Sequence, residues 1–387
     1  MKPSFLLTFV VVLSLQMALA GEPPLAFSGA EGFGRFASGG QGGEMIHVTS
    51  LDDSGPGSFR DSVSKSHRIV VFDVSGIIRL KSNVRVNNDL TIAGQTAPGD
   101  GIMLYGRSVS FSGQTNLIVR YLRFREGIAG DRGRGSVDLS GGSDMIFDHC
   151  SIEWGRWDCL RVTQGSHDIT FQNCITGEGI DPQRFGSLTD TVTNITYSHN
   201  LWINNHSRNP KAKGRIQYFN NVIYNWGVCG LVGGHSQFDH FLDAAGNYFI
   251  AGPDSGPHFV GEFTATDHVY QRDNYADVNR DGKLNVRVVV AGDFGGGASV
   301  PTFMTHLTVA TPTSVTIGSA VAAFSNVIAH AGCSLHRDAV DARLIEEVTS
   351  LGVRGKHIQT ETEVGGPGAL MEIHAPANLK AVDDEKL

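Results

Sequence analysis

The sequence predicts an all-β protein in which one segment of chain recurs as stacked β-strands. Three observations support this prediction. The composition is rich in glycine and poor in charge, a nine-residue phrase recurs along the middle of the chain, and a polar residue is repeated at one position of that phrase. Together they indicate a parallel β-helix, a solenoid in which successive coils lie on top of one another.

The composition favours β structure and excludes some classes of function. The 387 residues include 48 glycines, and charged residues make up only 18% of the chain. Many glycines and few charges favour turn-rich β structure over a helical bundle, and 41% hydrophobic residues are enough to form a core. The net charge of −8 argues against a protein that follows a nucleic-acid backbone, because such proteins are normally basic.

The recurring phrase reads NLIVRYLRF in its first clear copy and DITFQNCIT in its third. Its copies start at Asn116, Asp144, Asp168, Asn194 and Arg215, with a looser copy at Phe241 and an earlier relative near Asp89. Apolar residues alternate at the second and fourth positions, as in Leu117 and Val119. A period of two is typical of strands with one buried face.

The seventh position of the phrase carries a repeated small polar residue, which is Cys150, Cys174, Asn200, Asn221 or Asn247. Such a repeat is explained if the copies stack about 4.8 Å apart as parallel strands, so that like residues share hydrogen bonds. Copies start 21 to 28 residues apart, which leaves room for two or three short strands and no connecting helix. Stacking also brings Cys150 over Cys174, close enough for a disulfide if oxidised, although buried free thiols are expected for most of the five cysteines.

The ends of the chain differ from this ladder. Residues 1–20 have the pattern of a secretory signal peptide, with Lys2, an apolar run and cleavage expected after Ala20; the alternative, a membrane anchor, would need a longer apolar run. We expect a single domain over 21–387, with coils at about 69–251 and a C-terminal extension at about 252–387. Residues 21 to about 68 should wrap or cap the N-terminal end, and 338–350 should be an amphipathic helix packed on the β-helix.

Several motifs, in order along the chain, resemble the pectate lyase family, polysaccharide lyase family one, in an exported bacterial form. They are AFSGAEGFG (26–34), DDSGPGSFRDSV (52–63), LTIAGQTAPGDGI (90–102), NLIVRYLRFR (116–125), FDHCSIEW (147–154), HSRNPKAKG (206–214), FNNVIYNWG (219–227), RDAVDARLI (337–345) and EVGGPG (363–368). The resemblance implies a right-handed parallel β-helix. It also implies calcium-assisted β-elimination of polygalacturonate to 4,5-unsaturated products, in a secreted protein found outside the cell or in the periplasm.

The resemblance places the catalytic base at Arg208, in the segment Arg208-Asn209-Pro210-Lys211-Ala212-Lys213. A base is needed to remove the proton from C5 of a uronide. Arginine is normally locked in its charged form, so this role requires strongly positive surroundings, which Lys211, Lys213 and calcium would supply. Lys213 would hold the substrate, and Arg184 would replace a lysine of the family. From the residues alone, the same group is equally an anion clamp for uronate carboxylates.

For the calcium ion, the sequence offers Asp148 and Asp158, with Glu178 and Asp181 completing the ligand set, because hard oxygen ligands suit this metal. The chain departs from the family pattern here. Gly135 stands where relatives have an acid thirteen residues before Asp148, and Arg161 falls near their later ligand. His149, His199 and His206 are assigned to packing within the ladder rather than to metal binding.

A second calcium site is suggested by Asp277, Asn279 and Asp281, which match positions one, three and five of an EF-hand-like loop. Position twelve is Val288 rather than glutamate, and no flanking helix is expected. A polar loop without metal is the alternative reading.

Two other functions remain open. A β-helix glycoside hydrolase on the same polymer would need paired acids, which the coils after Asn194 do not offer. A non-catalytic β-helix that binds acidic polysaccharide is the other alternative, since some of the family's acids are missing. The expected partner is polygalacturonate, with neither nucleic acid nor membrane, and the chain is expected to act as a monomer.

Overall fold

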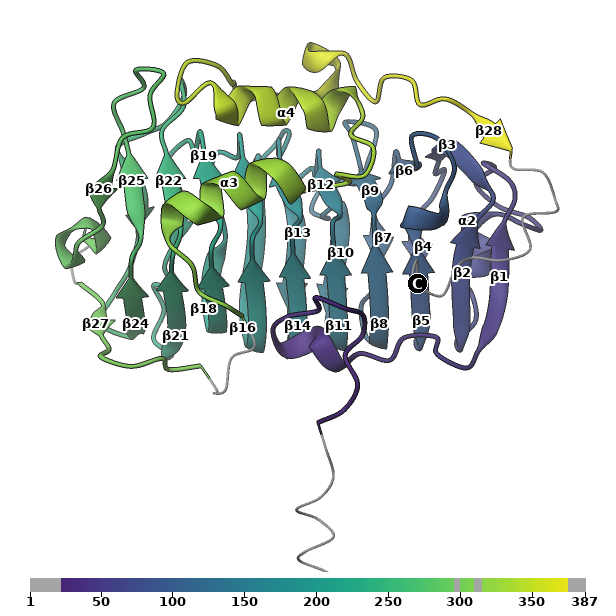
Figure 1. Ribbon diagram of the computed structural model, residues 1–387, viewed down its shortest axis with the longest axis horizontal. Coiled ribbons are helices and arrows are strands. Elements are labelled where there is room, and N and C mark those ends of the chain that lie inside the picture. Colours follow the sequence, from purple (N-terminus) through teal and green to yellow (C-terminus); the bar gives the residue numbers. More distant parts are fainter. Residues whose placement is uncertain (1–21, 296–299, 310–314, 375–387) are drawn as a thin grey trace, which may run out of the picture.

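The computed structural model describes residues 22–295, 300–309 and 315–374, and it is a parallel β-helix (Figure 1). The predicted fold class is thereby confirmed. Residues 1–20, predicted to be a signal peptide, lie outside the described residues. The strands of each coil lie on three faces of the solenoid, named here A, B and C. The chain passes through them in the order A, C, B and then returns to face A one coil further along. Within the described residues, no helix is long and apolar enough to cross a membrane.

Face A contains the recurring phrase. Its strands are β1 (Glu44–Val48), β2 (Arg68–Phe72), β5 (Leu90–Ala93), β8 (Thr115–Arg120), β11 (Ser143–Asp148), β14 (His167–Gln172), the second halves of β16 (Phe185–Ser198) and β18 (Lys211–Phe219), β21 (His240–Ala245), β24 (Asp267–Arg272) and β27 (Thr302–Phe303). The apolar positions stack in register as predicted, and Leu117, Met145 and Ile169 pair across three successive coils. Their side chains are buried inside the solenoid.

Face C follows face A after one sharp corner, and from β12 onward its parallel strands have three residues each. Its strands are β3 (Val74–Arg79), β6 (Ile102–Tyr105), β9 (Leu122–Arg125), β12 (Ser151–Glu153), β15 (Ile175–Gly177), β17 (Leu201–Ile203), β19 (Val222–Tyr224), β22 (Tyr248–Ile250) and β25 (Tyr275–Asp277). Two antiparallel strands close its ends, β26 (Arg287–Val288) beside β25 and β28 (Ile373–His374) beside β3.

Face B follows face C through loops whose length varies from coil to coil. Its strands are β4 (Val84–Arg85), β7 (Val109–Ser110), β10 (Val137–Ser140), β13 (Asp158–Thr163), the first halves of β16 and β18, β20 (Cys229–Val232) and β23 (His258–Gly261). One register row runs along the solenoid through Asp138, Arg161, Leu188, Lys211 and Val232. Side chains from consecutive coils therefore lie side by side on this face.

The corner between faces A and C contains the predicted polar ladder. The side-chain amide of Asn200 donates to Asn221 at 3.0 Å, Asn221 donates to Asn247 at 3.1 Å, and Asn247 donates to Asn274 at 2.8 Å. These asparagines are buried, so the ladder satisfies polar groups that would otherwise be costly. The Cys150–Cys174 disulfide allowed by the stacking is not formed; all five cysteines are buried free thiols.

The coils extend further than expected at both ends. Strand β1 pairs with β2 from Glu44 onward, and β24 and β25 add another coil that ends at Asp277. The last coil was not recognised in the sequence because the fourth position of its phrase is the polar Gln271 instead of an apolar residue. Its seventh position, Asn274, does fit the asparagine ladder. The ladder residues therefore reach beyond 69–251.

Two added layers cover the outside of the solenoid. Residues 26–37, with the short helix η1 (Phe33–Phe36), lie on the outer side of face A across β11 and β14 (Figure 1). This segment comes so close that a Cβ at Gly34 would stand 1.9 Å from the carbonyl oxygen of Met145. Only glycine permits that approach. Helix α2 (Phe59–Ser62) buries Phe59 in the core at the N-terminal end, as expected for a cap.

Helices α3 (Ala320–His330) and α4 (Ala339–Thr349) cover face C (Figure 1). The predicted helix at 338–350 is confirmed as α4, and α3 was not predicted. Val327 of α3 and Leu344 of α4 pack on an outer apolar cluster that includes Leu201 and Tyr248. The remaining short helices are η2 (Gly94–Thr96), η3 (Ala291–Phe294) and η4 (Glu361–Val364). With faces A and C covered along these stretches, face B is the open side near the predicted site.

Candidate active site

Arg208 lies at the point where the loop from face C enters face B. Its guanidinium donates to Asp158 Oδ1 at 2.9 Å and stacks over the ring of Phe185 at 4.0 Å. The side chain is 21% exposed, whereas Asp158 is fully buried. The structure thus brings together Arg208 and Asp158, two residues predicted from sequence as base and metal ligand.

Asp158 is poised between its charged and neutral forms. Burial raises the pKa of its carboxyl group to about 6, although Arg208 and Arg161 oppose the shift. Its second oxygen, Oδ2, has no hydrogen-bond partner among the described residues, and the Nε of Arg161 lies 4.0 Å from it. A buried carboxylate oxygen without a partner is a costly arrangement that a bound cation would relieve.

Asp138 is a second acid of this site, and the sequence analysis missed it. It lies in the preceding coil, in register with Arg161, and its charge is among those that raise the pKa of Asp158. Its carboxylate is 3.8 Å from Arg161 and 3.6 Å from Arg134. Burial raises its pKa as well. The acid was sought thirteen residues before Asp148, where Gly135 stands. The turn from face B to face A is only Gly141-Gly142, so the acid falls ten residues before instead.

Beside Arg208, a cavity of about 340 Å³ opens on face B. It is lined by Pro182, Gln183, Arg184, Phe185, His206, Ser207, Arg208, Lys211, Val228, Val232, His235 and Glu262. The predicted substrate-binding residues Arg184 and Lys211 are therefore in the same cavity as Arg208. Lys213 lines a neighbouring cavity of about 760 Å³ and pairs with Asp190 at 3.1 Å.

The cavity is positively charged on the side of Arg208. Burial, and then the charges of Arg208 and Lys213, lower the pKa of the Lys211 amine. Burial and the charge of Arg184 likewise lower the pKa of His206. A site with this many cations in a partly enclosed space is suited to a polyanionic ligand.

Two predicted calcium ligands lie elsewhere. Asp148 is on the outer side of face A, under the segment of residues 26–37, and its carboxylate contacts Arg120, Gln172 and His149 within 3 Å. Its side chain does point away from the core, as expected, but the covering segment removes it from the solvent and from face B. The structure does not bring it to Asp158.

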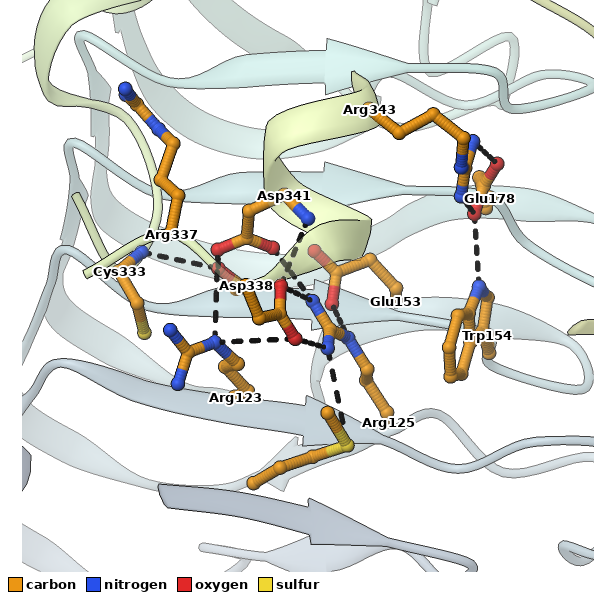
Figure 2. A network of polar contacts seen from close by, with 12 residues as sticks. Arg123, Arg125, Glu153, Trp154, Glu178, Cys333, Arg337, Asp338, Asp341 and Arg343 are labelled. Carbon is orange, nitrogen blue, oxygen red and sulfur yellow. Dashed lines mark hydrogen bonds and ion pairs between the residues drawn. The ribbon is translucent and has the colours of Figure 1, made fainter. Parts of the chain in front are cut away.

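Glu178 is likewise committed to another contact. It accepts two hydrogen bonds from Arg343 of helix α4, at 2.7 and 2.8 Å, and one from the indole of Trp154 at 3.0 Å (Figure 2). Asp181 stands 3.7 Å from Arg184, which lines the cavity, and is 45% exposed. Within the described residues, no group of three or more His, Cys, Asp or Glu side chains is arranged to hold a metal ion.

The loop after β25 brings its predicted residues together. The side-chain amide of Asn285 donates to Asn279 at 3.2 Å and to Asp281 at 3.0 Å. The backbone N–H of Asn285 donates to the carboxylate of Asp277 at 2.9 Å. These hydrogen bonds close the loop without an ion, so calcium binding here stays a prediction. The loop follows face C and is not part of the cavity on face B.

The histidines of the ladder pack as expected. His149 stacks on Tyr121 with ring centroids 4.6 Å apart, and His199 lies 3.6 Å from Glu31 of the covering segment. His206 is different because it lines the cavity next to Arg208.

Comparison with known proteins identifies the family. A probable pectate lyase C from Aspergillus terreus is 44% identical over 352 residues, which cover 89% of this chain and 82% of the relative. A probable pectate lyase C from Emericella nidulans is 42% identical, covering 89% and 81%. The chain belongs to the pectate lyase family. No family model matched the sequence.

Solved structures support the fold of the family. The thermostable pectate lyase PL 47 has a TM-score of 0.60 at 14% identity, covering 81% of this chain and 98% of that one. The cedar pollen allergen jun a 1 has a TM-score of 0.56 at 18% identity, covering 78% and 92%. The two pectate lyase C relatives named above are fungal, so the predicted bacterial form of the family is not supported.

Proposed function

We propose that this pectate lyase family member cleaves polygalacturonate by β-elimination at the cavity on face B, with calcium assistance. The observation that carries the proposal is Arg208, half-enclosed between Asp158 and Phe185, at the wall of a cavity lined by further cations. The position of Arg208, and the segment Arg208-Asn209-Pro210 in which it lies, fit the base that removes the proton from C5 of a uronide. Arg184, Lys211 and Lys213 would bind the carboxylates of neighbouring uronides.

Calcium fits this site in one particular way. Asp138 and Asp158 supply two carboxylates from adjacent coils, and Asp158 Oδ2 is buried without a hydrogen bond. Two carboxylates are too few for a closed calcium site, since the ion takes six to eight oxygen ligands. We therefore expect Asp138 and Asp158 to hold the ion jointly with the substrate carboxylate. There it would supply the positive charge that makes the C5 proton more acidic.

The ion pair between Arg208 and Asp158 then has a functional consequence. Asp158 holds Arg208 in an ion pair, and a charged guanidinium cannot act as a base. A cation held by Asp158 would offset the charge of this carboxylate, and Arg208 would then lie mainly among the positive charges of Lys211, Lys213 and Arg184. The positive surroundings that a role as base requires would therefore be complete only when substrate and ion are both in place.

Incubation of residues 21–387 with polygalacturonate tests the proposal. We expect ultraviolet absorbance from 4,5-unsaturated products to rise with calcium, stop with excess chelator, and resume when calcium is restored. New reducing ends without absorbance would indicate hydrolysis. Binding without either signal would indicate a polysaccharide-binding protein, an alternative favoured by Arg161 at the position of a family acid.

We also propose that the chain is secreted, as its N-terminal sequence and the family resemblance suggest. The signal pattern ends at Ala20. Expression of the full chain in a fungal host, followed by N-terminal sequencing of the protein in the medium, tests this. A mature chain beginning at Gly21 is expected, and retention of the protein in the cells would contradict it.

A further inference from the structure

Lys211, His235 and Glu262 form a continuous chain of contacts along the wall of the cavity on face B. The amine of Lys211 lies 3.0 Å from His235 Nε2, and His235 Nδ1 lies 3.1 Å from Glu262 Oε2. The three residues come from successive coils, on β18, after β20 and after β23, and all of them line the same cavity as Arg208.

The direction of these hydrogen bonds follows from the chemistry of the groups. A lysine ammonium can only donate, so His235 Nε2 accepts from Lys211, and the ring proton on Nδ1 is then directed to the carboxylate of Glu262. The carboxylate therefore fixes the ring, and the ring fixes the amine. Each contact favours the charged, proton-bearing form of Lys211.

Opposing charges surround this amine. Arg208 and Lys213 disfavour its charge, Glu262 and Asp190 favour it, and burial adds to the first effect. Under the net effect of these groups the pKa of Lys211 is lowered, which is the direction that makes an ammonium a better proton donor near neutral pH.

A β-elimination needs such a donor. When the base takes the C5 proton, the electron pair of the C5–H bond forms the C4=C5 double bond and the C4–O4 bond breaks. The pair from that bond goes to O4, which leaves with the neighbouring sugar and requires a proton. Arg208 is assigned as the base that takes the C5 proton. In the proposed function, Lys211 contributes only its positive charge, so no residue yet supplies the proton to O4.

We propose that Lys211 is the general acid that protonates the departing O4, and that His235 and Glu262 are positioning residues that hold its ammonium group toward the cavity. This inference rests on the proposed elimination. One proton leaves C5 for Arg208 and one leaves Lys211 for O4. Lys211 then regains a proton, and Arg208 loses one, to water in the open cavity, so that protons and electrons balance over a turnover.

Lys211→Arg separates this role from a carboxylate clamp. Arginine keeps the positive charge, but it does not give up a proton in this pH range. If Lys211 is the acid, kcat on polygalacturonate should fall by about 10²-fold or more while KM changes little. A wild-type kcat in Lys211→Arg would overturn the proposal, because charge alone would then suffice.

Glu262→Gln tests the positioning pair and does not depend on the fate of the Lys211 variant. Removing the carboxylate takes away a charge that raises the pKa of Lys211, so the alkaline limb of the kcat profile should move to lower pH. Asp239→Asn is the matched control. Asp239 is an exposed carboxylate that contacts His268, and its loss should leave the profile unmoved.

An unmoved alkaline limb in Glu262→Gln, or an equal shift in Asp239→Asn, would overturn the role of the pair. Melting of each variant, followed by circular dichroism, shows whether it is folded. A wild-type protein that forms no unsaturated product would overturn the elimination itself. A wild-type protein that forms product, with a kcat and pH profile that ignore both substitutions, would overturn only the general acid.

Discussion

Faces B and C of this β-helix both carry arginine–carboxylate pairs, but the two arrangements differ in what covers them. On face C, Arg125 is fully buried and contacts Glu153, Asp338 and Asp341 under the N-terminal end of α4 (Figure 2). On face B, Arg208 hydrogen bonds to a single carboxylate and opens on a cavity. An arginine enclosed by three carboxylates stabilises the packing of a helix, whereas one with a single buried partner can exchange that partner for substrate.

The same comparison explains why acidic residues with similar sequence settings have different roles. Glu178 and Asp148 each have several donors and are covered, by α4 or by residues 26–37. Asp158 is equally buried but keeps one oxygen without a donor. Neither burial nor an oxygen without a donor separates a structural carboxylate from a functional one, because Oε1 of the structural Glu153 also lacks a donor. Asp158 differs in that its arginine partner, Arg208, lines a cavity.

Arg208→Lys should have the largest effect on activity and almost none on stability. The substitution keeps the charge but removes the planar group that contacts Asp158 and Phe185, so we expect the elimination rate to fall by about 10²–10⁴-fold. The rate of absorbance increase measures the first effect, and the thermal midpoint measures the second. A loss of activity that parallels a loss of folded protein would show that Arg208 is structural.

Arg125→Met should have the opposite profile. It leaves Glu153 buried without its cation, and leaves Asp338 and Asp341 with Arg123 alone, at 3.6 and 3.9 Å. Breaking a buried pair in this way costs about 3–5 kcal/mol. Denaturant unfolding measures the change in the free energy of unfolding. At denaturant concentrations below the unfolding midpoint, the folded protein should keep the wild-type kcat. An unchanged unfolding midpoint with a reduced kcat would show instead that these residues of face C take part in the reaction.

Asp158→Asn should weaken the response to calcium without abolishing folding. Loss of a carboxylate from a site that has only two should raise the calcium concentration for half-maximal rate by at least about 10–100-fold. The wild-type protein should lose activity as the pH falls below about 6, because Asp158 is then protonated. A higher calcium concentration should move this loss of activity to lower pH. A loss of activity whose pH does not depend on calcium would contradict the assignment of Asp158 as a calcium ligand.

Asn221→Ala should have the smallest effect and act on stability alone. It removes the middle of the asparagine ladder, so that the backbone N–H of Asn200 and the carbonyl of Tyr197 lose a buried partner, at a cost of about 1–3 kcal/mol. Asn247 still accepts from the backbone N–H of residue 221. Thermal or denaturant unfolding measures it. A change in kcat larger than the change in folded fraction would mean that the ladder also positions face B.

The sequence predicted the solenoid well because its signal is periodic. Leu117, Met145 and Ile169 repeat at one register, and the asparagines repeat at another, so stacking could be inferred without a structure. The last coil was missed because Gln271 replaces an apolar residue. Helix α3 was also missed, and so was the path of residues 26–37 over face A, because no repeat in the sequence marks which face a covering segment will lie on.

The candidate site was predicted only in part, because its residues are marked by local motifs and not by a repeat. Arg208, Lys211 and Arg184, which were predicted from a local motif and its neighbouring coil, line one cavity, and their roles stay predictions. Asp138 was missed because the length of the turn between faces B and A varies from coil to coil, which shifts the spacing of acids along the chain. His235 and Glu262 follow strands with no distinctive motif, and only their distances from Lys211 single them out.

A crystal structure of the Arg208→Lys protein with trigalacturonate and calcium would test the location of the site most directly. The account predicts that the trisaccharide lies on face B between Arg184 and Lys213, with calcium between its carboxylate and the carboxylates of Asp138 and Asp158. A trisaccharide bound on another face, or calcium bound only at the loop of residues 277–285, would contradict it.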